Sequence, residues 1–178
     1  MPVLVRSRLR RARLLLPAVQ ALTQQILNAA DCPHALVSLD FVGDDRMRRL
    51  NRSYRGHDAT TDVLAFAMRE AQGPRTPLLG DVVISLDTAA RQAKAQGHDL
   101  RREIAILLVH GILHLLGFDH ERAESEARRM KAKERAILKR LIPLPSLVSG
   151  PGLRLNFGEK RSTFKRARWV GFNDLQKA

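Results

Sequence analysis

LRREIAILLVHGILHLLGFDH, residues 100–120, is the stretch that decides the fold of this chain. Its apolar residues cover nearly the whole circumference of a helix over residues 100–116, and they are Ile104, Ile106, Leu107, Leu108, Val109, Ile112, Leu113, Leu115 and Leu116. A helix that is apolar on every side is buried. We therefore expect this helix to lie at the centre of the core, with an N-terminal cap at Asp99 and an end at Gly117.

Shorter segments on both sides of this helix predict a sheet and further helices. Strands are expected over residues 3–6, 36–42, 62–68 and 81–86, and helices over residues 16–30, 45–51, 87–97 and 125–141. Polar loops are expected over residues 53–61 and 70–80. This mixed order is typical of an α+β domain: a small mixed sheet of about four strands, the buried central helix packed on it, and other helices around it.

The composition indicates one domain of ordinary size with an added tail. We expect the domain to span residues 1–147 and a flexible basic tail to span residues 148–178. The chain has one cysteine, Cys32, which excludes an internal disulfide, argues against a thiolate metal cage and fits the cytoplasm. No apolar run approaches the ~20 residues of a membrane span, so no membrane partner is expected. The N-terminus superficially resembles a secretion signal, but its apolar patch is short and contains Pro17.

The net charge of +13 is concentrated at the two ends of the chain. Residues 1–13 hold five arginines and no acid, and residues 150–178 hold seven Lys or Arg against two acids. Such ends either attract nucleic acid or are simply solvated termini. The tail residues that we expect to bind RNA are Arg154, Lys160, Arg161, Lys165, Arg166 and Arg168.

Three histidines lie in and just after the central helix: His110, His114 and His120. Residues four apart project from the same side of a helix, and Gly117 allows a left-handed bend after which His120 can fold back toward the other two. Three imidazoles leave the fourth position of a tetrahedral zinc ion open, as in catalytic zinc sites. We therefore predict one zinc ion per chain, although iron, nickel or manganese suits the same ligands. Core histidines bonded to backbone groups are the alternative.

The spacing H-x₃-H-x₅-H is also that of the metzincin proteases. Those enzymes need a glutamate directly after the first histidine as general base, and this chain has Gly111 there. Helix geometry allows glutamate at this position, so its absence argues against a peptidase. Phosphodiester cleavage depends less on a protein general base. A metal can polarise a phosphate oxygen and activate water, while a cationic side chain neutralises the charge that builds up on the phosphate.

Two further side chains are candidates for that chemistry. The guanidinium of Arg55, next to Gly56, could bind two phosphate oxygens at once. The alternative is that Arg55 is an ordinary surface arginine. Asp119 lies beside His120 and could accept a proton or orient a ligand, although it could equally cap the following helix.

Three stretches resemble, in order and spacing, the bacterial YbeY endoribonucleases, a family of rRNA maturation factors: YRGHDATTDVLAF (54–66), LLGDVVIS (78–85) and HGILHLLGFDH (110–120). The resemblance covers roughly residues 35–142. It implies a zinc-dependent endoribonuclease that cuts single-stranded RNA, acts near the 3′ end of small-subunit rRNA and takes part in ribosome quality control. It also implies that the three histidines bind zinc and that Arg55 and His114 are catalytic.

The chain departs from the family pattern in two places. Ala65 and Ala67 stand where the family reads close to T-D-V-L-S-F-P, and the basic tail extends beyond the usual family length. Two other functions stay open from the sequence. One is a non-catalytic ribosome-associated factor that binds rRNA and holds a structural metal, with His57 or His98 as the fourth ligand. The other is a metzincin-like metallohydrolase or peptidase.

Overall fold

A computed structural model describes residues 3–7, 9, 13–68, 77–118 and 123–149. Within these residues the elements follow in the order β1 (Val3–Ser7), β2 (Arg13–Leu14), α1 (Leu16–Ala29), β3 (Leu36–Val42), α2 (Asp44–Arg55), β4 (Val63–Ala67), β5 (Leu78–Ser85), α3 (Leu86–Gln96), α4 (Leu100–Leu115), α5 (Glu124–Arg140) and β6 (Val148–Ser149). The expected α+β class is confirmed.

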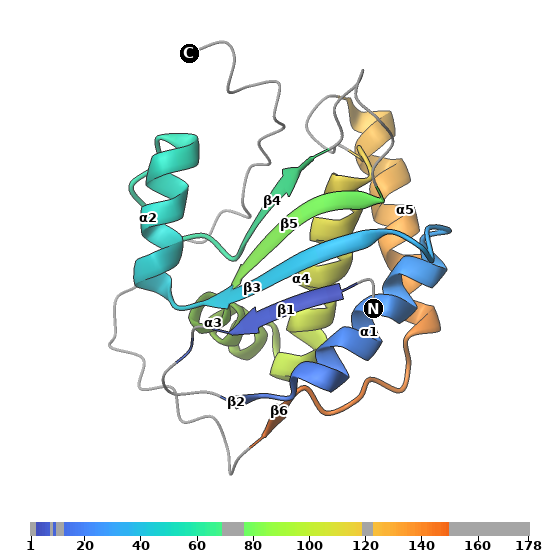
Figure 1. Ribbon diagram of the computed structural model, residues 1–178, viewed down its shortest axis with the longest axis horizontal. Coiled ribbons are helices and arrows are strands. Elements are labelled where there is room, and N and C mark those ends of the chain that lie inside the picture. The colour runs from blue at the N-terminus through green and yellow to red at the C-terminus, as the bar shows by residue number, and fades with distance from the viewer. Residues whose placement is uncertain (1–2, 8, 10–12, 69–76, 119–122, 150–178) are drawn as a thin grey trace.

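The main sheet has four strands in the order β1-β3-β5-β4 (Figure 1). β1, β3 and β5 run parallel, and the edge strand β4 runs antiparallel to β5, so the sheet is mixed as expected. A second ladder, β2 with β6, was not expected: Leu14 pairs with Val148. It carries the folded body to Ser149, just past the expected domain end at residue 147. The character of the tail stays a prediction, because residues 150–178 lie outside the described part.

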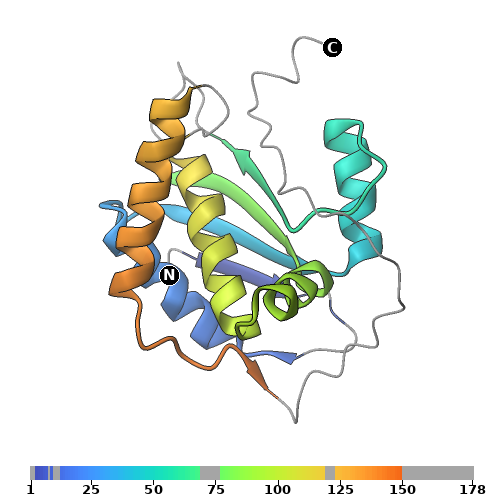
Figure 2. The same ribbon diagram turned by 180° about the vertical axis from the view of Figure 1, so that it is seen from behind.

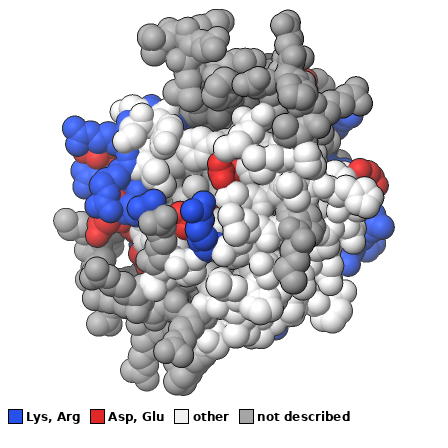
Figure 3. Space-filling model, in the orientation of Figure 1, with Lys and Arg blue, Asp and Glu red and all other residues white. Residues whose placement is uncertain are grey.

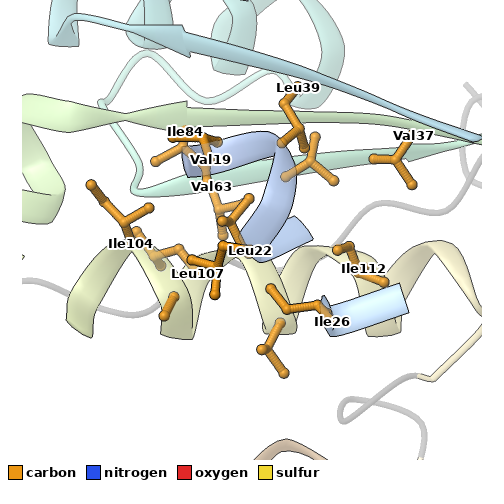
Figure 4. Close-up of a cluster of buried hydrophobic side chains, with 14 of the residues drawn as sticks. Val19, Leu22, Ile26, Val37, Leu39, Val63, Ile84, Ile104, Leu107 and Ile112 are labelled. Atoms are coloured by element: carbon orange, nitrogen blue, oxygen red, sulfur yellow. The ribbon is translucent and has the colours of Figure 1, made fainter. Parts of the chain in front are cut away.

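Side chains of the strands alternate between the two faces of the sheet. Val82 and Ile84 of β5 join the large core under α1 and α4, whereas Val83 between them joins a small cluster with Met47 of α2. Figure 2 shows α1, α4 and α3 in front of one face of the sheet, with α5 packed beside α4. Figure 4 shows this large core, in which α1, the strands and α4 contribute Val19, Leu22, Ile26, Val37, Leu39, Val63, Ile84, Ile104, Leu107 and Ile112.

Helix α4 begins and ends as its sequence predicts. The side chain of Asp99 accepts a hydrogen bond from the backbone N–H of Arg102 at 2.9 Å, which caps the first turn. At the other end Gly117 has a φ of 90°, and its N–H bonds to the carbonyl of His114 at 2.9 Å. This left-handed residue turns the chain out of the helix directly after the histidine pair.

The structure corrects two of the expected element boundaries. Strand β5 begins at Leu78, although residues 70–80 were expected to be a loop. Gly80 reads as a turn residue in the sequence, but a Cβ there would overlap the carbonyl oxygen of Phe66 on β4, so glycine permits close strand pairing. Helix α2 runs to Arg55 rather than Asn51, and Gly56, with a φ of 68°, ends it. No helix in the described part of the chain is long and apolar enough to cross a membrane.

Candidate functional site

His110 and His114 lie one turn apart on the same side of α4, as predicted. Their Nε2 atoms are 3.0 Å apart, and their rings meet edge to face with 4.5 Å between centroids. Two imidazole nitrogens bound to one tetrahedral zinc ion at ~2.0–2.1 Å would be roughly 3.3 Å apart. The two rings therefore already point at a common position.

The histidine pair is shielded from water. His114 is 2% exposed, and the side chain of His110 is 18% exposed. Zinc prefers neutral imidazole nitrogens among its ligands. Two shielded imidazoles that face one position are therefore compatible with the zinc ion that the family resemblance implies.

The second ring nitrogen of His110 contacts an acid from another helix. Nδ1 of His110 lies 2.7 Å from Oε1 of Glu134 on α5. Glu134 was not among the candidates from the sequence, although a signal for it exists. It follows Met130 by four residues and precedes Ile137 by three, so it shares the buried face of α5 with them. A carboxylate on such a face needs a partner.

The predicted third ligand and its neighbour are not in the described part of the chain. His120 and Asp119 fall in the undescribed stretch 119–122, directly after Phe118. Among the described residues no group of three or more His, Cys, Asp or Glu side chains could hold a metal ion, and only two of the three predicted ligands are described. The three-histidine site therefore stays a prediction. The tail residues predicted to bind RNA also lie outside the described part.

The two histidines considered as a fourth ligand lie in other settings. His57 is exposed in the loop after α2. Nε2 of His98 is 3.1 Å from Oε2 of the buried Glu103, near the first turn of α4. At 1.5 Å per residue, the cap Asp99 and His110 are separated by about 16 Å along the helix axis. His98 is therefore not placed to complete a site at His110.

Gly111 faces the sheet, where a side chain would meet two valines. A Cβ on Gly111 would lie 2.7 Å from Cγ1 of Val82 and 3.5 Å from Cγ2 of Val63. A glutamate at this position was expected to be compatible with the helix, and for an isolated helix it is. In this fold a side chain at position 111 would force Val82 of β5 to shift. The packing of α4 against β5 therefore disfavours a general base at position 111.

Arg55 lies on a different layer of the molecule from the histidines. It is the last residue of α2 and half-buried, and its positive charge suits the C-terminal end of a helix. Figures 1 and 2 both show edge strand β4 between α2 and α4. A site that uses both Arg55 and the histidines must therefore extend across the β4 edge.

The loop that follows Arg55 is held to α2 by two side chains. Nε and Nη2 of Arg48 bond to the two carboxylate oxygens of Asp58 at 2.8 and 2.7 Å. Nδ2 of the buried Asn51 donates to the carbonyl of Ala59 at 2.7 Å. The loop therefore has a fixed path beside the end of α2.

Asp44 ties the start of α2 to the same loop and to α3. Its Oδ1 accepts hydrogen bonds from Ser85 at 2.6 Å, Thr88 at 2.8 Å and Thr60 at 3.2 Å, and its Oδ2 is 2.6 Å from Nη2 of Arg91. Burial acts to raise the pKa of Asp44, but the hydrogen bonds from Ser85, Thr88 and Arg91, with the charge of Arg91, outweigh it. The pKa of Asp44 therefore lies below its ordinary value.

Arginines gather over α2 on the surface seen in Figure 3. The helix carries Arg46, Arg48, Arg49, Arg52 and Arg55, and its exposed surface also includes Asp45. Most of the remaining described surface in that view is uncharged. The arginine-rich part of this surface therefore includes the end of α2, where Arg55 lies.

A family model described as "Endoribonuclease YbeY" matches residues 8–142, which include α4 and its histidines. The chain belongs to the YbeY endoribonuclease family. It is 41% identical over 140 residues to Endoribonuclease YbeY of Syntrophotalea carbinolica and 45% identical over 140 residues to that of Geobacter metallireducens, in each case covering 77% of this chain and 93% of the relative. It is also 52% identical over 123 residues to Endoribonuclease YbeY of Pelotomaculum thermopropionicum, covering 66% and 80%.

The fold of this YbeY family member also matches a solved structure. The solution structure of TM1509 from Thermotoga maritima superposes with a TM-score of 0.58 and covers 78% of this chain and 88% of that chain. At 21% sequence identity this likeness concerns the fold alone. The resemblance inferred from the three motifs is confirmed by the family match.

Proposed function

We propose that this YbeY family member is a zinc-dependent endoribonuclease that cuts single-stranded RNA in small-subunit rRNA maturation and in ribosome quality control. Family membership makes it an endoribonuclease, a hydrolase that acts on RNA, and rRNA maturation is the family function. The observation that carries the metal is the convergence of two Nε2 atoms 3.0 Å apart in a shielded setting. The ribosomal small subunit is the expected partner, and the cytoplasm the expected compartment.

His110 and His114 would hold the zinc ion through Nε2, with His120 as the third ligand. A bound zinc ion supplies Lewis-acid chemistry at a phosphate group. The packing of Gly111 against Val82 supports the arrangement, because it holds this turn of α4 against a strand of the sheet. Rigidly held ligands keep the productive geometry without a further ordering cost.

Arg55 would bind the phosphate at which the chain is cut. Its guanidinium can donate two hydrogen bonds to phosphate oxygens and neutralise the charge that builds up on them. Since β4 separates α2 from α4, the RNA strand would cross the β4 edge between the two helices. The other arginines of α2 would attract the RNA backbone and make binding depend on salt.

The test compares wild type with His114→Ala and Arg55→Ala in metal content and in cleavage of single-stranded RNA. We expect His114→Ala to lose both metal and cleavage while keeping its fold. Arg55→Ala should keep the metal and lose activity by about 100-fold or more, as for removal of a donor to a developing charge. Undiminished cleavage by His114→Ala, with contaminating nuclease excluded, would remove the metal from the mechanism.

The same preparations separate the two alternative functions. A metal that has four protein ligands and whose removal unfolds the chain would favour the non-catalytic rRNA-binding factor. Cleavage of peptides but not of RNA oligomers would favour the peptidase. Gly111 argues against the peptidase, because it has no side chain to serve as the base and a larger residue there would force Val82 to shift.

A further inference from the structure

Glu134 makes a contact to which the proposed mechanism assigns no role. Its Oε1 lies 2.7 Å from Nδ1 of His110, while Nε2 of the same ring lies 3.0 Å from Nε2 of His114. Carboxylate oxygens accept hydrogen bonds, so this geometry assigns the donor role to Nδ1 of His110. In a neutral imidazole the lone pair is then on Nε2, the nitrogen that faces His114.

We propose that Glu134 is a positioning residue for the metal site, one that fixes the tautomer and the ring orientation of His110 so that its Nε2 lone pair faces the shared cation. This inference rests on the proposed function, because it assigns Glu134 a role toward the metal. Without the carboxylate the ring can also carry its proton on Nε2, and that tautomer cannot bind a metal through Nε2. Acids behind ligand histidines commonly act in this way.

The surroundings of Glu134 favour this pairing over a surface ion pair. Its neighbours four residues away on α5 are Met130 and Leu138, both apolar, and Lys131, three residues before it, is exposed. The side chains of Glu134 and His110 are each only 18% exposed. A shielded hydrogen bond of 2.7 Å is stronger and better oriented than an exposed one.

The contact between the two Nε2 atoms agrees with the same assignment. A separation of 3.0 Å needs one proton between the nitrogens. Since Nε2 of His110 carries the lone pair, Nε2 of His114 donates this proton. A cation that binds both nitrogens takes the place of this proton, so His114 must then carry its own proton on Nδ1.

The experiment uses the full-length chain with Glu134→Ala, Glu134→Gln and the matched control Glu124→Gln. Glu124 is on the same helix, but its partner Arg128 is on the surface and its own side chain is 86% exposed. Zinc affinity is measured by competition with a chromophoric chelator. The tautomer of His110 in the metal-free protein is read from ¹⁵N chemical shifts of the ring, and unfolding in urea reports stability.

We expect Glu134→Ala to weaken zinc binding by about 10- to 100-fold and to allow the Nε2–H tautomer of His110. Glu134→Gln keeps an oxygen acceptor and should fall between Glu134→Ala and wild type, whereas Glu124→Gln should match wild type. Zinc affinity of Glu134→Ala within twofold of wild type would overturn the proposal, even if the variant were less stable. That result would leave Glu134 as a structural bridge between α4 and α5.

His114→Ala separates failure of this inference from failure of the proposed function. If His114→Ala binds zinc as tightly as wild type, the metal site itself is wrong. If His114→Ala loses zinc while Glu134→Ala keeps it, the metal site stands and only the positioning role of Glu134 is wrong.

Discussion

Gly111 of α4 meets Val82 of β5 so closely that a Cβ on the glycine would lie 2.7 Å from Cγ1 of the valine. Val82 is 1% exposed and β-branched, so its side chain has little freedom to move aside. This contact sets how near the histidine-bearing turn of α4 comes to the sheet.

Gly111→Ala should therefore destabilise the protein. Overpacking a core costs about 1–3 kcal/mol, whereas alanine in place of glycine within a helix contributes only about 1 kcal/mol in return. We expect a net loss of stability in urea unfolding. In the Val82→Ala background, where the clashing methyl groups are absent, Gly111→Ala should be neutral or stabilising. Equal effects in the two backgrounds would mean that Val82 is not the obstacle.

Asp44 should make stability depend on pH. Its folded-state pKa lies below the unfolded value, so its contribution is complete above the unfolded pKa and is lost as the pH falls through the folded pKa. Asp44→Asn removes the charge that faces Arg91 and should cost about 1–3 kcal/mol near neutral pH. Urea unfolding between about pH 7 and pH 3 checks this. The difference between wild type and Asp44→Asn should shrink at the acid end, and a constant difference would contradict the assignment.

The two anchors of the loop after Arg55 should differ in strength. Asn51→Ala leaves the carbonyl of Ala59 without its buried donor and should cost about 1–3 kcal/mol. Arg48→Ala breaks an ion pair whose side chains are 58% and 50% exposed, so it should cost less than about 1 kcal/mol. Hydrogen exchange of residues 56–60 should quicken clearly only in Asn51→Ala. The reverse order would show that the surface pair, not the buried amide, holds the loop.

The basic tail should supply part of the RNA affinity through charge. Its predicted contacts are Arg154, Lys160, Arg161, Lys165, Arg166 and Arg168. Each lost contact to single-stranded RNA lowers the slope of log affinity against log salt by about 0.7. Replacing all six by glutamine should lower that slope by up to about 4 and leave the unfolding free energy unchanged. An unaltered slope would assign the phosphate contacts to other residues, the arginines of α2 among them.

Several features of this protein could be read from neighbouring residues alone. The strand over residues 36–42, the cap at Asp99 and the bend at Gly117 are confirmed as expected. Each depends on interactions between residues a few positions apart: alternation along a strand, a side-chain bond to the next turn, or the φ of one residue. The shared side of His110 and His114 belongs to the same class, because helix periodicity alone places them together.

Other features depend on residues far apart in the chain, and the sequence alone did not show them. Gly80 looked like a loop residue, but it lies in β5 because Phe66 of the neighbouring strand approaches its backbone. The short ladder of β2 with β6 joins segments at opposite ends of the described chain.

The candidate site also has features of both kinds, local and long-range. The sequence by itself determined that two imidazoles point the same way from one buried helix. Only the tertiary structure decided that Glu134 lies behind His110 and that a Cβ at position 111 would meet Val82. The physical reason is the distance along the chain over which each interaction acts. Backbone periodicity, which is local, sets which side chains share a face, whereas packing between helices and strands far apart in the sequence decides what each face contacts.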